Sequence, residues 1–576
     1  MKPPPIQKRL ASRVAGAVLA VALGMAVHPV ARSGEKAGGP EAAEPVPAFP
    51  EAVTRLGEPP PFRCGKVDAA FVAKVPEARR WVNSGMAALY AESGFEALRC
   101  FHRAAMAEPD CARAWWGVAL SIHGRFHEWA ALRAAAAERA RRCAGGEPHE
   151  AGWAAMAQAA AGSDLAEALD ALRSLCRDFP DDVDARIWLA GLSREPVAAG
   201  GEPSPFQRFA EAGFADLLVR RPDHPGVLAG SVRVLLDDPS ETNLALAVER
   251  GRPLARLGAA WGPLRRLAAE PMARRGDWIG ALKGFAEADR LERACLKAEG
   301  LAAGDFPEHH ETLQWRCLAA MMAGRAAEAG DAAAALEGLV PGDGRGRSEG
   351  GQRWLYHGRT AQGTVAWRLG QSARAVEAMK PVLAAPEMTY AGLFALHLEV
   401  QRALEAGKQA EAERQMGQYE AAMDAYLSPL AEVKQVRNRW WHESAKVAGI
   451  LEAFDAARLH GRAGDRGKAV TTLTEAWNRV RAFGPGLERW LVVAPEEMAA
   501  AVWRDLGDFS AEADALIGIR SNGYAQLALA EAMLRLSRPA EARAAAERAL
   551  AVWAEADPDF APVVRARAFA GGGAAK

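Results

Sequence analysis

The chain has almost no net charge. It contains 71 Lys and Arg residues against 72 Asp and Glu residues, which leaves a formal net charge of -1. A surface without an excess of positive charge does not attract nucleic acid or an anionic membrane over distance. We therefore expect no nucleic-acid partner, and no membrane contact beyond one that the N-terminus makes.

Recognisable catalytic machinery is missing as well. The Gly-rich stretches lack the Gly-Lys-Ser/Thr ending of a phosphate-binding loop, and they follow no predicted strand. A hydrolase needs a nucleophile held by a base and an orienting third group, and no such set can be recognised. The sequence therefore predicts no enzyme, no catalytic residue and no cofactor.

Cysteine is scarce and irregularly placed. The 7 residues are Cys64, Cys100, Cys111, Cys143, Cys176, Cys295 and Cys317. An odd number without regular spacing is no disulfide framework, although an exported protein would meet conditions that permit disulfides. We expect reduced thiols that fill small apolar spaces.

Alternating runs of β-branched residues are also scarce, whereas alanine is abundant, which is typical of packed helices. The stretch from Trp81 to Pro109 predicts a helix, a turn and a second helix. Gly85 and Ala97 are small where two helices would approach closely, while Trp81 and Phe101 would fill the adjacent volume. This order resembles the tetratricopeptide repeat, whose period is about 34 residues. Such a unit must stack on neighbours to bury its apolar face.

One local signature recurs along the chain. A Gly that would end one helix is followed five positions later by an Ala early in the next. The pairs are Gly276 and Ala281, Gly324 and Ala329, Gly370 and Ala375, Gly407 and Ala412, and Gly464 and Ala469, with Ser537 and Ala542 as a variant. Gly suits a left-handed terminating position, and Ala suits the tight contact that follows. The predicted fold class is all-α, a TPR-like α-solenoid of antiparallel helix pairs with degenerate repeats. The 17 Trp residues are expected to fill its core rather than form a ligand cage.

The chain is expected to have six parts. Residues 1–31 combine basic residues, a short apolar run and small residues, which predicts a signal peptide and a periplasmic or extracellular location. An uncleaved signal that tethers the protein to the membrane is the alternative. The other parts are a disordered linker at 32–62, an N-terminal arm at 63–340, a Gly-rich linker at 341–352, a C-terminal arm at 353–560 and a disordered tail at 561–576.

The chain further resembles a group of long bacterial tetratricopeptide proteins. The resemblance rests on Ala97 to Gly117, which contains EPDCARAWWG, and on shorter similar pieces as far as AVWAEAD, which ends at Asp557. It implies a repeat scaffold. Relatives of this group carry clustered histidines, and the aligned positions here are Pro263, Arg266, Glu270, Glu311 and Gln314. Whatever those histidines do in relatives, this chain should not do in the same way.

The remaining histidine pairs do not predict a metal site. His123 and His127 have the spacing of two ligands on one helix face, but Gly124 interrupts them and no third ligand is near. His309 and His310 are adjacent, so they cannot chelate one ion together, and a solvated turn is expected for them.

The favoured function is an exported scaffold that holds a segment of a partner protein in its concave groove. Mixed aromatic and polar side chains on the inner helix faces suit peptide capture. The residues expected there are Arg113, Trp116, His123, His357, Trp367, Phe394, His397, Gln401 and Arg458. Two alternatives remain open: an enzyme or metal-dependent protein with a site embedded in the repeats, and a purely structural spacer.

Overall fold

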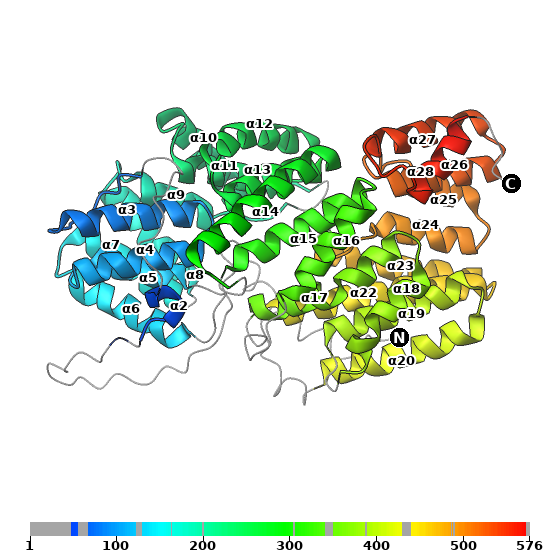
Figure 1. Ribbon diagram of the computed structural model, residues 1–576, viewed down its shortest axis with the longest axis horizontal. Coiled ribbons are helices and arrows are strands. Elements are labelled where there is room, and N and C mark those ends of the chain that lie inside the picture. The colour runs from blue at the N-terminus through cyan, green and yellow to red at the C-terminus, as the bar shows by residue number, and fades with distance from the viewer. Residues whose placement is uncertain are drawn as a thin grey trace. The chain divides into compact units, whose positions relative to one another are not determined.

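A computed structural model describes residues 46, 48–55, 67–122, 129–162, 164–197, 201–302, 306–339, 349–385, 389–428, 439–484, 487 and 490–571. Over these ranges the ordered elements are helices, and no strand occurs among them (Figure 1). Successive helices pair into antiparallel hairpins, and the hairpins stack along the chain. The all-α, TPR-like solenoid predicted from the repeats is confirmed.

Contacts group the chain into two compact units. Unit 1 comprises Met1–Ala268, Arg290–His309 and Arg347–Gly351, and unit 2 comprises Ala269–Asp289, His310–Gly346 and Gln352–Lys576. The helices wholly within unit 1 are α2 (Glu51–Arg55), α3 (Pro76–Tyr90), α4 (Gly94–Ala107), α5 (Ala112–Ser121), α6 (Ala130–Cys143), α7 (Pro148–Ala161), α8 (Leu165–Asp178), α9 (Val183–Leu192), α10 (Pro205–Arg220), α11 (Pro225–Leu236) and α12 (Glu241–Leu257).

Four helices have residues in both units, and the rest belong to unit 2. The shared helices are α13 (Gly262–Arg274), α14 (Trp278–Glu299), α15 (Pro307–Met322) and α17 (Glu349–Arg368). Unit 2 also contains α16 (Ala326–Gly338), α18 (Ser372–Leu383), α19 (Tyr390–Glu405), α20 (Gln409–Leu427), α22 (Arg439–Arg462), α23 (Arg466–Phe483), α24 (Pro495–Asp505), α25 (Phe509–Leu516), α26 (Gly523–Arg535), α27 (Pro539–Val552) and α28 (Ala561–Ala570).

The first predicted hairpin is α3 followed by α4. Ala97 and Phe101 are fully buried, and a Cβ added at Gly85 would lie 2.8 Å from the Phe101 ring. Gly117 on α5 approaches the same ring, since a Cβ there would lie 2.1 Å from its edge. Phe101 therefore packs between two helices that can approach it only because both positions are glycine.

The recurring Gly and Ala positions behave as their spacing predicts. The five glycines and Ser537 all have positive φ, from 57° at Ser537 to 81° at Gly276, and the six alanines are at most 1% exposed. The residue after each turn donates its N–H back to a carbonyl five positions earlier, as from Lys408 to Ala403 at 2.9 Å. This bond, with the left-handed residue before it, is the Schellman helix ending.

Three more described turns of the same kind escaped the sequence pattern, at Glu92, Gly300 and Gly507. Glu92 has φ 59° and Gly507 has φ 71°, and Ser93 and Asp508 make the corresponding bonds to carbonyls five positions earlier. Five positions after Glu92 stands the buried Ala97, but five after Gly507 stands Glu512, which is fully buried and paired with Arg504. A search for Gly followed by Ala misses all three.

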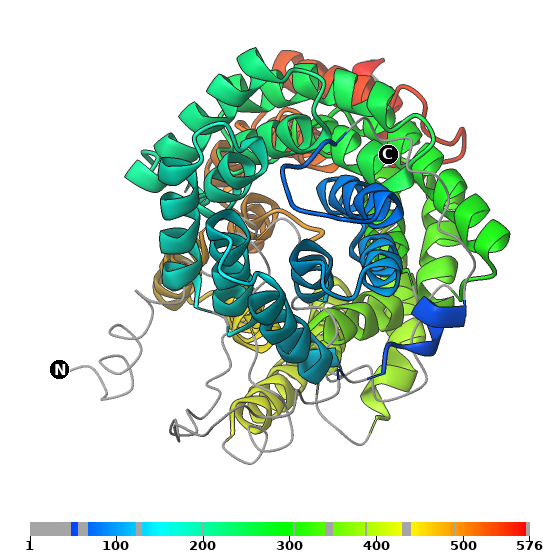
Figure 2. The same ribbon diagram turned by 90° about the vertical axis from the view of Figure 1, so that its left-hand side faces the viewer.

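In unit 1 the first helices of the hairpins pack on one another. α3 contacts α5, α5 contacts α7 and α9 contacts α11, and α3 also contacts α11, which comes four hairpins later. Gly226 at the start of α11 allows this approach, since a Cβ there would lie 2.7 Å from the Tyr90 ring. Figure 2 shows these blue to green helices following one another around a curve. Their inner faces are therefore filled by neighbouring helices.

Parts of the predicted disordered segments are ordered helix. Within residues 32–62, α2 places Val53 in the core at 3% exposure, and the Phe49 ring lies 4.4 Å from that of His102. Within residues 561–576, α28 buries Val563 and Ala566. Each segment is short but has apolar residues on one face, so it packs rather than remains extended. Most of the predicted linker Pro341–Gln352 and all of residues 1–31 lie outside the described residues, and the division into arms stays a prediction.

None of the described helices combines the length and the apolar character that a membrane crossing requires. The six described cysteines, Cys100, Cys111, Cys143, Cys176, Cys295 and Cys317, are free thiols. All 17 tryptophans are described and each is buried or half-buried, in agreement with their expected role as core residues.

Candidate functional site

The predicted groove residues are mostly interior. Arg113 and Trp116 on α5 are each 1% exposed, and on α19 and α22 the buried members are Phe394, His397, Gln401 and Arg458. His357 and Trp367 on α17 are half-buried. His123 lies outside the described residues, as does His127.

The six buried residues therefore line no open groove within the described part of their own unit, whereas His357 and Trp367 keep part of their surface exposed. The inner faces of consecutive first helices touch, as α3, α5 and α7 do in unit 1 and α19, α22 and α24 do in unit 2. Side chains on those faces meet other helices of the same unit instead of solvent. Whether a partner contacts any of them stays a prediction.

In unit 1 a charged network surrounds Arg113. Its guanidinium lies 4.4 Å from the centre of the Trp153 ring, and its Nη2 lies 3.6 Å from Oε1 of Glu150 and donates to the carbonyl of Ala70. Nε and Nη1 of Arg113 have no hydrogen-bond partner among the described residues. A buried guanidinium needs a nearby carboxylate to offset its desolvation, and Glu150 supplies it.

His149 connects this pair to the next hairpin. It lies on the first turn of α7, and its Nε2 is 2.7 Å from Oδ2 of Asp182, the N-cap of α9. The same carboxylate accepts from Trp153 Nε1 at 3.0 Å and from the N–H of Ala185 at 2.9 Å. Burial alone would lower the pKa of His149, but its contacts with the carboxylates of Asp182 and Glu150 outweigh burial and raise it to about 9.

A second buried group continues the network toward α11. The Tyr90 hydroxyl donates to Asp184, and the His224 ring lies at 5.3 Å from the Tyr90 ring, edge to face. Burial raises the pKa of Asp184 to about 6, and burial together with Arg221 lowers the pKa of His224 to about 4. His224 is therefore neutral in the folded chain at pH 7, and its Nδ1 accepts from the N–H of Gly226 at the start of α11.

Unit 2 brings five of the predicted residues together. Asp455 on α22 is fully buried, and its carboxylate contacts Nδ1 of His397 at 2.7 Å and accepts from Gln401. Gln401 in turn accepts from Arg458, whose Nε donates to Asp505 at 2.9 Å. The Trp367 and Phe394 rings pack against the imidazole of His397, at 5.2 Å and 6.0 Å between ring centres.

A nucleophilic site needs a nucleophile, a general base and a group that orients the base. These networks place imidazoles beside carboxylates, so they contain the last two of these groups. No hydroxyl or thiol contacts His149 or His397 among the described hydrogen bonds. Burial also raises the pKa of the Cys111 and Cys176 thiols to about 11, so neither is an activated nucleophile. The described geometry supports interior charge pairing that joins neighbouring hairpins.

Sequence reasoning missed several residues of these networks. His149 and Asp182 are 33 positions apart, one repeat period, and both lie at helix N-termini where acidic and capping residues are common. His309 and His310 were expected in a solvated turn, but they lie on α15 at 3% and 1% exposure. The stretch 346–350 has the pattern Gly-x-Ser-x-Gly, which sequence reasoning did not single out. The element described before it is helix α16, not the strand that a nucleophile elbow requires.

Comparisons with known proteins identify helical repeat proteins at low similarity. No family model matches the chain, and no curated protein matches its sequence. A tetratricopeptide repeat protein from Parabacteroides merdae is 13% identical, with 53% of this chain and 100% of that chain covered and a TM-score of 0.33. Human IFIT1, solved as a dimer with m7Gppp-AAAA, is 14% identical with 84% and 92% covered and a TM-score of 0.33.

The APC/C hetero-tetramer Cut9-Hcn1 is a third similar structure, at 12% identity, with 85% of this chain and 90% of that chain covered and a TM-score of 0.25. Identities and TM-scores this low carry no argument about function. The fold assignment therefore rests on the helices and turns of this chain itself.

Proposed function

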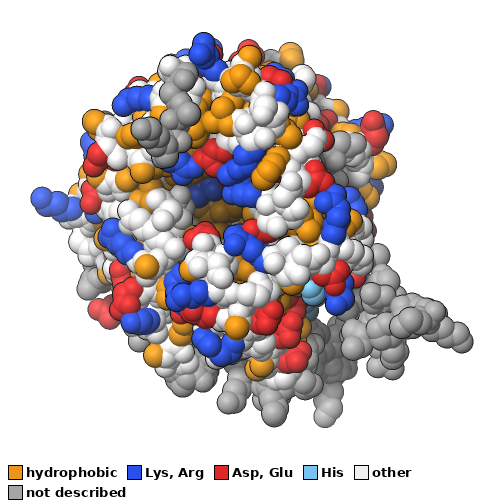
Figure 3. Space-filling model, turned by 90° about the vertical axis from the view of Figure 1, so that its right-hand side faces the viewer, with side chains coloured by type: hydrophobic (Ala, Val, Ile, Leu, Met, Phe, Trp, Pro, Cys, Tyr) orange, Lys and Arg blue, Asp and Glu red, His pale blue; other side chains and the backbone are white. Residues whose placement is uncertain are grey.

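We propose that the protein is an exported scaffold that binds a segment of a partner protein and performs no catalysis itself. The observation that carries the proposal is the serial stacking of helix hairpins, because solenoids of this kind present long surfaces and generally act in protein interaction. Figure 3 shows acidic and basic side chains interspersed over one face, and no field of a single sign dominates it. A mixed surface suits a protein partner better than a polyanion.

Among the predicted groove residues, Trp367 and His357 retain solvent access. Both lie on α17, and a half-buried Trp beside polar groups is a common anchor for a bound segment. Trp367 is therefore the position at which the scaffold proposal is tested most directly.

The first step is to capture partners of the full-length chain from the exported fraction of its source organism and to purify one of them. Its affinity is then compared for wild type, Trp367→Leu and the control Trp503→Leu, a half-buried Trp on α24. We expect Trp367→Leu to weaken binding by at least about tenfold, since hot-spot aromatics dominate interfaces, and the control to leave it unchanged. A partner bound equally by all three proteins argues against this surface, and the lack of any saturable partner supports the structural spacer.

Export is tested separately, because residues 1–45 lie outside the described residues. Fractionation of the source cells and N-terminal sequencing of the mature protein should place it outside the cytoplasm with the first residue near position 32. Recovery with the membrane and an intact N-terminus would favour the tethered alternative.

A further inference from the structure

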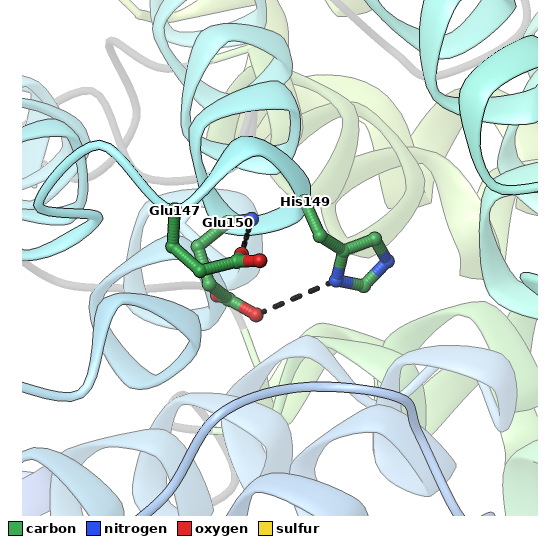
Figure 4. A group of neighbouring side chains, drawn as sticks. All are labelled: Glu147, His149 and Glu150. Atoms are coloured by element: carbon green, nitrogen blue, oxygen red, sulfur yellow. Dashed lines mark hydrogen bonds and ion pairs between the residues drawn. The ribbon is translucent and has the colours of Figure 1, made fainter.

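Three side chains at the start of α7 lie close together and could share one ligand. Glu147, His149 and Glu150 each present a ligand atom within 4.8 Å of the others (Figure 4). Glu147 is exposed, His149 is half-buried, and Glu150 is 4% exposed. The cluster thus has one side open to solvent and one side closed by protein.

The orientation of His149 matches that of a metal-bound imidazole. Its Nε2 is held by Asp182 at 2.7 Å, and that carboxylate is itself fixed by Trp153 and by the first turn of α9. Metal-binding histidines commonly use one ring nitrogen for the metal and give the other to a carboxylate. Here the nitrogen that remains, Nδ1, faces Glu150.

The distance between those two groups also fits an ion. Nδ1 of His149 and Oε1 of Glu150 are 3.6 Å apart, which exceeds the length of a hydrogen bond. Two ligands that each lie about 2.0–2.1 Å from zinc at a tetrahedral angle are separated by roughly 3.3 Å. Oε1 of Glu150 is buried and has no hydrogen-bond partner among the described residues. This oxygen is ion-paired with Nη2 of Arg113 at 3.6 Å but accepts no hydrogen bond from the described part of the chain, so it can still contact a metal ion at a shorter distance.

The charges around the cluster also favour a bound cation. The carboxylates of Glu147, Glu150 and Asp182 outnumber the single guanidinium of Arg113, so one negative charge remains while His149 is protonated and two remain once a metal displaces its proton. One divalent ion neutralises them. Nitrogen and carboxylate ligands together are typical of zinc and related transition metals rather than calcium or magnesium.

We propose that Nδ1 of His149, Oε1 of Glu150 and the carboxylate of Glu147 bind a divalent transition metal of the zinc class, with water completing the coordination. The remaining oxygen of Glu147 is available, since its Oε2 accepts from the N–H of Glu150 as the helix cap. The ion would tie α7 to α9 through Asp182 and to α5 through Arg113. This site is independent of partner binding by the solenoid.

The test uses the full-length chain, treated with EDTA, dialysed and titrated with zinc chloride by calorimetry at pH 7. Wild type should bind one zinc ion tightly, and His149→Gln and Glu150→Gln should each weaken that binding by at least about tenfold. The matched control is His460→Gln, a half-buried histidine on α22, which should bind as wild type does. Absence of a tight zinc ion in wild type, or equal binding by His149→Gln, overturns the proposal.

Two further measurements keep the test decisive if an interior variant folds poorly. Glu147→Gln changes an exposed residue and retains a cap oxygen, so its helical circular dichroism should be unchanged while its zinc affinity falls. Cobalt in place of zinc should give the visible absorption of a four-coordinate site in wild type and lose it in Glu147→Gln. Unchanged zinc affinity in that variant would show that these carboxylates serve the helix N-terminus alone.

Discussion

Two glycines of one hairpin should respond in opposite ways to the same substitution. Gly407 ends α19 with φ 70°, whereas Gly417 lies within α20. Both are exposed, and a Cβ added at either would meet no other atom within 4 Å. Changes in packing and desolvation should therefore contribute equally little to the stability of the two variants, and only the backbone conformation distinguishes the two sites.

The expected magnitudes follow from that difference. Gly407→Ala forces an L side chain into the left-handed region at a cost of about 1–2 kcal/mol, offset by roughly 0.4–1 kcal/mol from the less flexible unfolded chain. Gly417→Ala should stabilise its helix by about 0.5–1 kcal/mol. The two variants should then differ by on the order of 1–2 kcal/mol, with Gly407→Asn falling between Gly407→Ala and wild type because Asn tolerates positive φ.

Hydrogen exchange of the α19 and α20 amides is the suitable assay. A stack of hairpins need not unfold in one step, so a local opening free energy is better defined than a global one. Faster exchange in Gly407→Ala and slower exchange in Gly417→Ala are expected, with urea midpoints that shift in the same directions. If both variants destabilise the hairpin equally, the positive φ of Gly407 is not what ends α19.

Three other predictions concern pH, packing and proteolysis. Because the pKa of His224 is lowered to about 4 in the folded chain, the unfolding free energy should fall as pH drops from about 6.5 to 4. His224→Asn keeps a cap acceptor but cannot take up this proton, so urea titrations of the variant should lack the part of the pH dependence that comes from His224. Gly117→Ala places a Cβ against Phe101 and should cost about 1–3 kcal/mol, whereas Gly191→Ala in α9 meets no atom within 4 Å and should not lower the urea midpoint. Trypsin should cut Pro341–Gln352 early. The two products should nevertheless coelute on gel filtration, because α16 and α17 on either side of the cut share one apolar cluster. Separate elution of the products would contradict this.

Much of the fold could be predicted because its signals are local. A left-handed Gly and an Ala five positions later are decided by sterics within a few residues, so Gly370 and Ala375 reveal a turn without any knowledge of the rest. The same reasoning fails at Glu92, where a non-Gly residue adopts the same conformation. There the side chain pairs with Arg233 and Arg266, which come from other hairpins and cannot be foreseen from the local sequence.

The interior networks could not be predicted from helix positions alone. Repeat numbering selected His397, Gln401 and Arg458, which the structure brings together, but it could not show that Asp455 on α22 lies buried among them. How far one hairpin rotates on the next depends on contacts such as that of Tyr90 with Gly226, which lie more than a hundred residues apart in sequence. Such distant pairs decide whether an inner face is open or filled.

The Schellman turns have a consequence for how the chain is made. Each turn closes through a hydrogen bond between residues only five positions apart, such as that from Lys408 to Ala403, so the turn needs nothing downstream in order to form, even though the hairpin gains its stability by stacking on its neighbours. During translation it can close once its own stretch of about 34 residues has left the ribosome. The growing molecule would then expose the apolar face of just one hairpin at a time, until the next one emerges and covers it.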